Sequence, residues 1–165
     1  MADSLASYQE VCPDAESFQY DSDLDDAIEA LGDDIYDSAF GKTYINEAVV
    51  GYDANGEIVG YVISVTSGDG FDGDITLSVG LTTDGTVVKI AFTTLNETAG
   101  MGMRVDEDAF KGQFEGVSTD AFVLNKSGGS TEENEIDTVS GASTSSGAVV
   151  NAVNTALAFF AANIG

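Results

Sequence analysis

The stretch Ile45-Asn-Glu-Ala-Val-Val-Gly-Tyr52 is followed by Asp53-Ala-Asn-Gly56 and then by Ile58-Val-Gly-Tyr-Val-Ile-Ser-Val-Thr66. The first and last of these segments are rich in β-branched and aromatic residues, which favour strands. Asn55-Gly56 between them accepts the positive φ angles that a tight hairpin turn requires. The sequence therefore predicts a β-hairpin here, and this hairpin indicates the fold class.

A second hairpin is predicted further along the chain, where Ile75–Thr82 and Thr86–Thr94 flank Thr83-Asp84-Gly85. Two hairpins in succession favour an antiparallel sheet. The more polar region that follows is predicted to contain a short helix, a short strand and a loop, at Asp106–Phe114, Ala121–Leu124 and Lys126–Glu135.

Apolar residues at helical spacing predict two longer helices. Leu24, Ile28 and Leu31 recur at i, i+4 and i+7 before Gly32, which favours a short amphipathic helix. Ser145–Asn163 has the clearest helical periodicity in the chain, with apolar residues along one face. The predicted fold class is therefore α+β: an antiparallel β-sheet of two hairpins covered by helices, with a long C-terminal helix.

The composition fits one domain and excludes one class of partner. The chain has 165 residues, of which 43% are hydrophobic, enough for a single core. Its 29 acidic residues outweigh 5 basic ones, and a formal net charge of -24 repels phosphate backbones, so no nucleic acid is expected as a partner. Residues 1–44 are predicted to be an acidic N-terminal segment with a short helix, packed on or leading into a domain formed by residues 45–165.

Cys12 is the only cysteine and the chain has no histidine, which excludes an internal disulfide, a Ser-His-Asp triad and a histidine-ligated metal. The segment Asp21-Ser-Asp-Leu-Asp-Asp26 begins like a calcium-binding EF-hand loop. Asp26, however, stands where that loop needs glycine, and Gly32 stands where it needs a bidentate glutamate. No metal site is predicted, and no run reaches the roughly 20 apolar residues of a membrane span.

The segment Asp137-Thr-Val-Ser-Gly-Ala-Ser143, together with Thr144 and Ser145, places many hydroxyl groups just before the last predicted helix. The first turn of a helix has free N–H groups and a partial positive charge, so a phosphate is favoured there. The same hydroxyls are also typical of a simple helix cap, with Ser143 or Ser145 at the N-cap position.

A second segment, Asn96-Glu-Thr-Ala-Gly-Met-Gly102, combines polar side chains with glycines. Glu97 and Thr98 offer polar groups, while Gly100 and Gly102 would let backbone N–H groups reach a planar ring. Taken alone, such a segment is equally typical of an ordinary glycine-rich turn.

Together and in this order, the two segments resemble the motifs of the FMN-binding domain family, over a region from about Ile45 to the C-terminus. In that family an Asp, two further residues, a Ser or Thr, and then Gly-Ala-Thr or Gly-Ala-Ser precede a helix. The resemblance implies that FMN is joined through its phosphate to Ser143 by a flavin transferase that uses FAD and magnesium. It also implies that the recognition residues are Asp137, Ser140, Gly141 and Ala142, with Thr144 and Ser145 as neighbouring hydroxyls.

This chain departs from the family pattern at a few positions. Most members have Thr where this chain has Ser143, but both residues offer a hydroxyl that forms a phosphoester. In the second segment Ala99 replaces Pro and Met101 replaces Leu of the family's Glu-Thr-Pro-Gly-Leu-Gly, and Phe110-Lys-Gly-Gln-Phe114 resembles the stretch that follows it. The resemblance implies that the flavin is also contacted by Glu97, Thr98, Gly100 and Gly102.

The combination of both motifs is similar to the flavin-carrying subunits of two membrane complexes, the Rnf ferredoxin:NAD oxidoreductase and the sodium-pumping NADH:quinone reductase. This similarity implies an electron-transfer subunit, rather than a stand-alone enzyme, that works with other membrane subunits on the extracytoplasmic face of the cell membrane. Those subunits are anchored by an N-terminal helix that this chain lacks, so it is expected to be the soluble domain of an anchored protein. Two alternatives stay open: a flavinylated carrier of another extracellular electron-transfer system, or a non-redox calcium-binding extracellular module.

Overall fold

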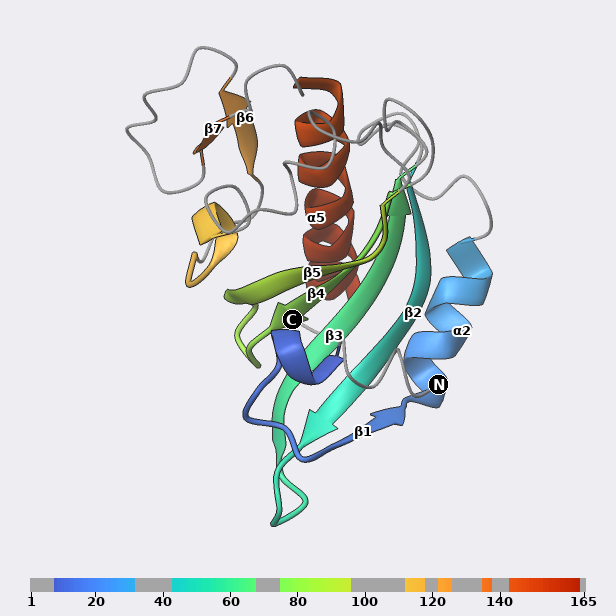
Figure 1. The fold of residues 1–165 in the computed structure, drawn as a ribbon. Coiled ribbons are helices and arrows are strands. Elements are labelled where there is room, and N and C mark those ends of the chain that lie inside the picture. The colour runs from blue at the N-terminus through green and yellow to red at the C-terminus, as the bar shows by residue number, and fades with distance from the viewer. Residues whose placement is uncertain are drawn as a thin grey trace.

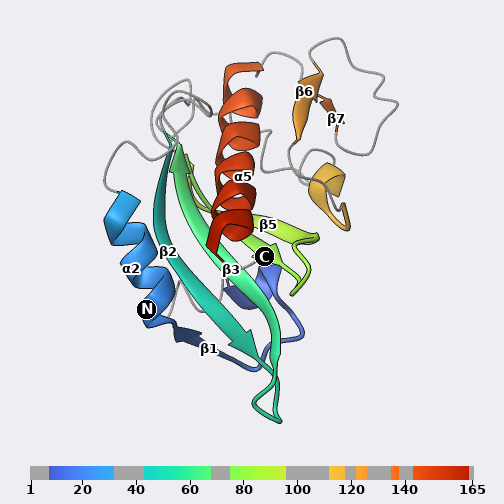
Figure 2. The ribbon, with the colours of Figure 1, turned by 180° about the vertical axis from the view of Figure 1, so that it is seen from behind.

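The structure, a computed structural model, describes residues 8–31, 43–67, 75–95, 112–117, 122–125, 135–137 and 143–163. Its centre is an antiparallel sheet whose five strands lie in the order β1 (Ser17–Tyr20), β2 (Thr43–Tyr52), β3 (Ile58–Ser67), β4 (Ile75–Leu81) and β5 (Val87–Leu95). Helix α5 (Ser143–Asn163) lies across one face of this sheet, and helix α2 (Ser22–Leu31) lies beside β2 (Figure 1; Figure 2). The predicted α+β class, antiparallel sheet and long C-terminal helix are confirmed.

Both hairpins form where the sequence predicts them, and glycine makes both turns possible. Gly56, between β2 and β3, has a φ of 79°, and Gly85, between β4 and β5, has a φ of 90°. A carboxylate oxygen of Asp53 accepts hydrogen bonds from the N–H groups of Asn55, at 2.8 Å, and Glu57, at 3.0 Å. Residues with a Cβ disfavour such φ angles, so the chain reverses most easily at these glycines. The two glycines therefore fix the position of each turn.

Three short elements differ from the prediction. The sequence does not predict β1, because its four residues, SFQY, are too few for their alternation to stand out, and most of them are exposed. β6 (Val123–Asn125) pairs in parallel with β7 (Glu135–Asp137), so the strand predicted at Ala121–Leu124 lies slightly later in the chain. The loop predicted at Lys126–Glu135 ends in a strand that the sequence does not predict, because three residues carry too little periodicity.

The helix predicted at Asp106–Phe114 is described only at its end. Its last three residues form the 3-10 turn η2 (Gly112–Phe114), and the others lie outside the described residues. η2 is nevertheless well anchored, since Phe114 is fully buried and its ring packs edge-on against that of Phe122, with ring centroids 4.9 Å apart. This turn thereby joins the main core.

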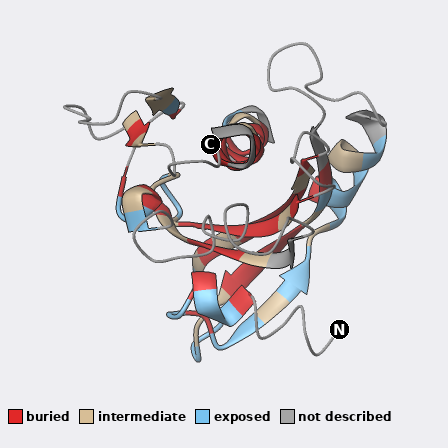
Figure 3. Cartoon of the chain, turned by 45° about the horizontal axis from the view of Figure 1, so that its top comes forward, coloured by how far each residue is buried: buried red, intermediate tan, exposed pale blue. Residues whose placement is uncertain are grey.

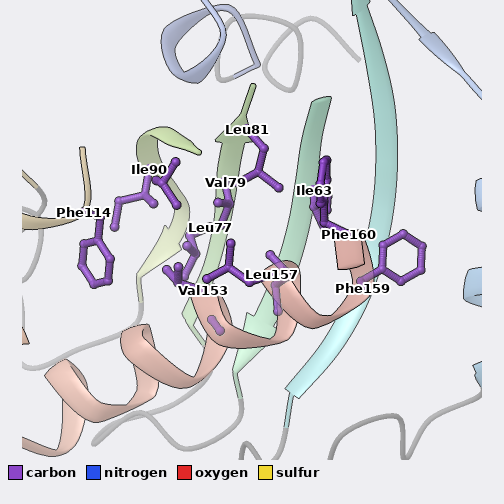
Figure 4. Close-up of a cluster of buried hydrophobic side chains, with 14 of the residues drawn as sticks. Ile63, Leu77, Val79, Leu81, Ile90, Phe114, Val153, Leu157, Phe159 and Phe160 are labelled. Atoms are coloured by element: carbon purple, nitrogen blue, oxygen red, sulfur yellow. The ribbon is translucent and has the colours of Figure 1, made fainter. Parts of the chain in front are cut away.

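The main core lies between α5 and one face of the sheet. Side chains alternate between the two faces along a strand, so every second residue of β4 faces the helix. Figure 4 shows Leu77, Val79 and Leu81 directed toward Val153 and Leu157 of α5, and all five side chains are buried. Burying one such side chain fully stabilises the fold by about 1.5–3 kcal/mol. This packing fixes the direction of α5, and therefore the place where the helix begins.

Residues 8–16 cover the opposite face of the sheet, beginning with a helical turn at residues 8–11. Four of their side chains are buried against Val49, Val62 and Ala91: Tyr8, Val11, Cys12 and Ala15. Figure 3 shows this turn and α5 on opposite sides of the sheet. The acidic N-terminal segment thus contains an apolar strip that belongs to the fold, whereas the division of the chain at residues 44 and 45 stays a prediction.

Helix α5 has 21 residues and is buried on most of its sides, as expected of a helix that is apolar all round. Apolar as it is, it does not qualify as a membrane span, and neither does any other helix in the described part of the chain. The helix also contains Gly147, whose added Cβ would meet only the Leu124 side chain, at 3.6 Å. That distance is an ordinary van der Waals contact.

Gly147→Ala is therefore expected to stabilise the protein by about 0.5–1 kcal/mol, because glycine inside a helix costs more backbone entropy than alanine. Urea denaturation, followed by circular dichroism, measures the change. Gly56→Ala is the control with the opposite sign, since the same methyl group enters open space there but forces alanine to a φ of 79°. A loss of stability in Gly147→Ala would contradict the packing of α5 against β6.

Candidate functional site

The structure describes both ends of the hydroxyl-rich segment. Asp137 is the last residue of β7 and Ser143 is the first residue of α5. Thr144 and Ser145 follow Ser143 in the first turn of the helix. The other site residues predicted from the sequence lie outside the described residues: Ser140, Gly141 and Ala142 of this segment, and Glu97, Thr98, Gly100 and Gly102 of the second segment.

The N-terminus of α5 favours a negatively charged group. The N–H groups of the first turn of a helix have no acceptor within the helix, and the aligned peptide dipoles add partial positive charge. The residues of α5 include no Asp or Glu and no Lys or Arg, although the whole chain has a formal charge of -24. A phosphate at Ser143 would therefore meet no carboxylate from the helix that it caps.

A glutamine on η2 holds the other end of the segment. The N–H of Asp137 donates a hydrogen bond of 2.7 Å to Oε1 of Gln113, and Nε2 of Gln113 donates one of 3.1 Å to the carbonyl oxygen of Asp137. One side-chain amide thus satisfies both backbone groups of Asp137. Sequence reasoning missed this role, because Gln113 and Asp137 are 24 residues apart and only their contact connects them.

The turn that carries Gln113 is tied to the main sheet. The N–H of Val87 in β5 donates to the carbonyl oxygen of Val117 at 3.0 Å, and the N–H of Gly116 donates to the carbonyl oxygen of Val87 at 2.7 Å. Together with the burial of Phe114, these bonds give Gln113 a rigid base. The position of Asp137 is therefore set from the five-stranded sheet as well as from β6.

A second amide makes the same kind of contact between α5 and β6. The buried Asn154 of α5 accepts a hydrogen bond of 2.7 Å from the N–H of Phe122 and donates one of 2.9 Å to its carbonyl oxygen. Phe122 precedes β6, so this contact fastens the small parallel sheet to the helix that begins at Ser143. A lone amide on the buried face of an apolar helix is the sequence signal that points to such a partner.

The segment that resembles the start of an EF-hand forms part of a helix instead. Residues 22–26 lie in α2, and a carboxylate oxygen of Asp21 caps that helix by accepting hydrogen bonds from the N–H groups of Asp23, at 2.9 Å, and Leu24, at 3.2 Å. Among the residues that the structure describes, no three Asp, Glu or Cys side chains form a group able to hold a metal ion.

Comparison with known families gives one match that covers both segments. A model of the family described as "FMN-binding domain" matches residues 70–158, which is more than half of the chain. The matched range contains Glu97 to Gly102 and Asp137 to Ser145.

Three curated relatives carry names of redox complexes, and each is the subunit designated G of its complex. The chain is similar to this subunit of the Na(+)-translocating ferredoxin:NAD(+) oxidoreductase complex of Acetobacterium woodii, with 31% identity over 88% of this chain and 68% of the relative. It is also similar to that of the proton-translocating ferredoxin:NAD(+) oxidoreductase complex of Clostridium ljungdahlii, with 34% identity over 60% of this chain and 52% of the relative. The corresponding subunit of the ion-translocating oxidoreductase complex of Methanosarcina acetivorans is 34% identical over 70% of this chain and 58% of its own length. The chain thus spans between about half and two thirds of these relatives.

Among solved structures, the crystal structure of Shewanella oneidensis NqrC has a similar fold, with a TM-score of 0.56 over 70% of this chain and 58% of that one. The sequence identity is 22%, so this likeness shows a shared fold alone.

Proposed function

This chain belongs to the FMN-binding domain family, and from that premise we propose that it is an electron-transfer domain that carries FMN in a phosphoester bond to Ser143. The observation that carries the proposal is the position of Ser143 at the N-terminus of a 21-residue helix without charged side chains. A phosphate attached there is stabilised by free N–H groups and by the helix dipole. Helix α2 also begins with a serine, Ser22, but Asp23 and Asp25 in its first turn would repel an added phosphate.

The attachment is a transfer from FAD, carried out by a flavin transferase with magnesium. Oγ of Ser143 forms a bond to the phosphorus of the FMN half of FAD, while the pyrophosphate bond to that phosphorus breaks. AMP leaves with the bridging oxygen, and the hydroxyl proton passes to a base. In this proposal the transferase recognises the residues on the N-terminal side of Ser143, namely Asp137, Ser140, Gly141 and Ala142, while Thr144 and Ser145 are not modified.

Once attached, FMN supplies the redox chemistry, since its isoalloxazine ring accepts and releases electrons. Ser143 would hold the phosphate at the start of α5. We assign contacts with the ring to the second segment, through Glu97, Thr98, Gly100 and Gly102. The glycines there allow the backbone to approach a planar group closely.

The names of the three relatives support a place for this chain in an ion-translocating oxidoreductase complex. Its partners would then be the other membrane subunits of that complex, and electrons would pass between them through FMN. In this proposal the domain works on the extracytoplasmic face of the membrane. Residues 45–165 form the flavin-carrying domain in this proposal, preceded by the acidic segment 1–44.

Co-expression with a flavin transferase tests the proposal directly. The purified chain is expected to gain the mass of one FMN group and a yellow colour that survives denaturation, whereas the chain expressed without the transferase gains neither. Intact-mass spectrometry and visible absorption measure the two properties. A folded chain that gains no mass beside a transferase active on another substrate would overturn the proposal.

A further inference from the structure

We propose that Gln113 is a positioning residue for the attachment of FMN: its side-chain amide holds Asp137 at a fixed place relative to the start of α5. This inference rests on the proposed function, because it takes Ser143 as the attachment site and Asp137 as the first residue that the transferase recognises. It goes beyond that function by naming a residue, outside both segments, on which the geometry of the attachment site depends.

The contact between Gln113 and Asp137 restrains both translation and rotation of the Asp137 backbone. In a strand, the N–H and the C=O of one residue point to the same edge, so a neighbouring strand normally satisfies both. At this edge of β7 the Gln113 amide takes that place, with bonds of 2.7 Å and 3.1 Å. A slip of β7 along β6, or a turn about its axis, would break both bonds together.

The base of this contact does not depend on β7. Gln113 lies on η2, where Phe114 is fully buried and where Gly116 and Val117 are hydrogen-bonded to Val87 of the five-stranded sheet. A restraint is only as rigid as the element that supplies it, and this one comes from the main core. Asp137 is therefore held against the same body that holds α5.

The attachment segment is thus fastened at both ends. On one side Gln113 and β6 hold Asp137, and on the other side Ser143 begins α5, whose Asn154 is bonded to Phe122 next to β6. Residues 138–142 connect these two points. With both ends held, Asp137 and Ser143 stay at one distance from each other. A transfer reaction is faster when the reacting groups are held in place before they react.

The consequence is a specific effect on the chain as a substrate of the transferase. If Asp137 loses its restraint, the transferase must order the segment itself, so kcat/KM for flavinylation falls although the fold persists. Gln113→Met removes both hydrogen bonds and keeps the length of the side chain. We expect kcat/KM to fall about tenfold, the size of effect typical for two lost hydrogen bonds.

The experiment uses the full chain, purified without flavin, with FAD, magnesium and a flavin transferase, at a temperature well below the melting temperature of every variant. Intact mass against time gives kcat/KM for the wild type, for Gln113→Met and for Gln113→Glu. Gln113→Glu keeps an acceptor for the N–H of Asp137, but when ionised it places a carboxylate oxygen against the carbonyl oxygen of Asp137, so we expect a loss at least as large. This second variant also carries the test if Gln113→Met does not fold.

Gly56→Ala is the matched control for lost stability. It strains the turn between β2 and β3 at a φ of 79°, away from Asp137, and we expect it to lower the melting temperature while leaving kcat/KM within about twofold of the wild type. If the wild type takes up FMN and both Gln113 variants react at its rate, Gln113 does not position the site, although the proposed function stands. If the fall in kcat/KM follows the fall in melting temperature in Gly56→Ala just as it does in the Gln113 variants, lost stability explains the effect and the inference fails. If the wild type itself takes up no FMN, the proposed function fails instead.

Discussion

Ser143→Ala is expected to abolish the attachment of FMN: after co-expression with a flavin transferase, the variant should keep the mass of the bare polypeptide and stay colourless. The reason is chemical, since the hydroxyl oxygen is the atom that forms the phosphoester and alanine has none. Loss of a hydroxyl at the start of a helix costs about 0.5–2 kcal/mol of stability, which a helix as deeply packed as α5 should tolerate. The variant should therefore fold and be inactive as an acceptor.

Neighbouring hydroxyls provide the controls for this result. Thr144→Ala and Ser145→Ala remove equivalent groups one and two residues further along α5, and both variants should keep the full mass increment. Ser143→Thr should also be flavinylated, since threonine offers the same phosphoester chemistry. An increment that persists in Ser143→Ala would move the attachment to another residue, which peptide mapping would then identify.

The sequence predicts well those parts of the fold that have a recognisable pattern within one short stretch of residues. The two hairpins follow from β-branched runs around Asn55-Gly56 and around Gly85, and the last helix follows from a regular apolar face. β1 and β7 are too short for such a pattern to be decisive, because a strand of three or four residues is specified mainly by the neighbour with which it pairs. The sequence could not indicate these neighbours.

The same distinction applies to the candidate site. Asp137 and Ser143 are found from a contiguous segment that resembles a family motif. The amides that hold the surroundings of that segment act across 24 residues, from Gln113 to Asp137, and across 32 residues, from Asn154 to Phe122. A side chain that bonds to the backbone of a distant residue leaves no spacing rule in the sequence, because any residue can supply backbone groups.

The acidic composition of the N-terminal segment does not indicate that part of it is buried. Its acidic residues indicate a solvated surface, yet residues 8–16 bury an apolar strip on the sheet. The strip packs closely against the sheet at glycines on three neighbouring strands: Gly51 of β2, Gly60 of β3 and Gly80 of β4. A Cβ added at Gly51 would lie 2.9 Å from that of Ala15, and one added at Gly60 would lie 3.0 Å from Sγ of Cys12. Glycines from three strands thus form one docking surface, and the sequence of any one strand does not indicate it.

Gly80→Ala is expected to release this segment from the sheet. The added Cβ would overlap the carbonyl oxygen of Val11 and lie 2.6 Å from its carbonyl carbon. Both are backbone atoms, so no change of rotamer relieves the overlap and the segment must move. Overpacking of a core costs about 1–3 kcal/mol, and a clash with backbone belongs at the upper end of that range.

Cys12 reports the release, because it is the only cysteine in the chain. Its side chain is 3% exposed, and burial raises the pKa of its thiol, so both access and thiolate formation slow its reaction with a thiol reagent. If Gly80→Ala lowers the free energy of opening by about 3 kcal/mol, labelling at pH 8 should become roughly 100-fold faster. The rate is measured by intact mass after timed addition of a maleimide.

Gly112→Ala is the matched control, since its added Cβ would meet only a carboxylate oxygen of Glu115, at 3.8 Å, and should leave the labelling rate unchanged. Far-UV circular dichroism separates release of the segment from global unfolding, because the sheet and α5 should persist in Gly80→Ala. Gly51→Ala should give an intermediate rate, as its nearest obstacle is the Ala15 side chain rather than backbone. Slow labelling in Gly80→Ala with an intact sheet would show that Cys12 stays covered although Gly80 has gained a methyl group, and the close contact between Gly80 and the Val11 backbone would then be wrong. Fast labelling of the wild type would instead show that residues 8–16 are a solvated extension, as the charge of the segment alone suggests.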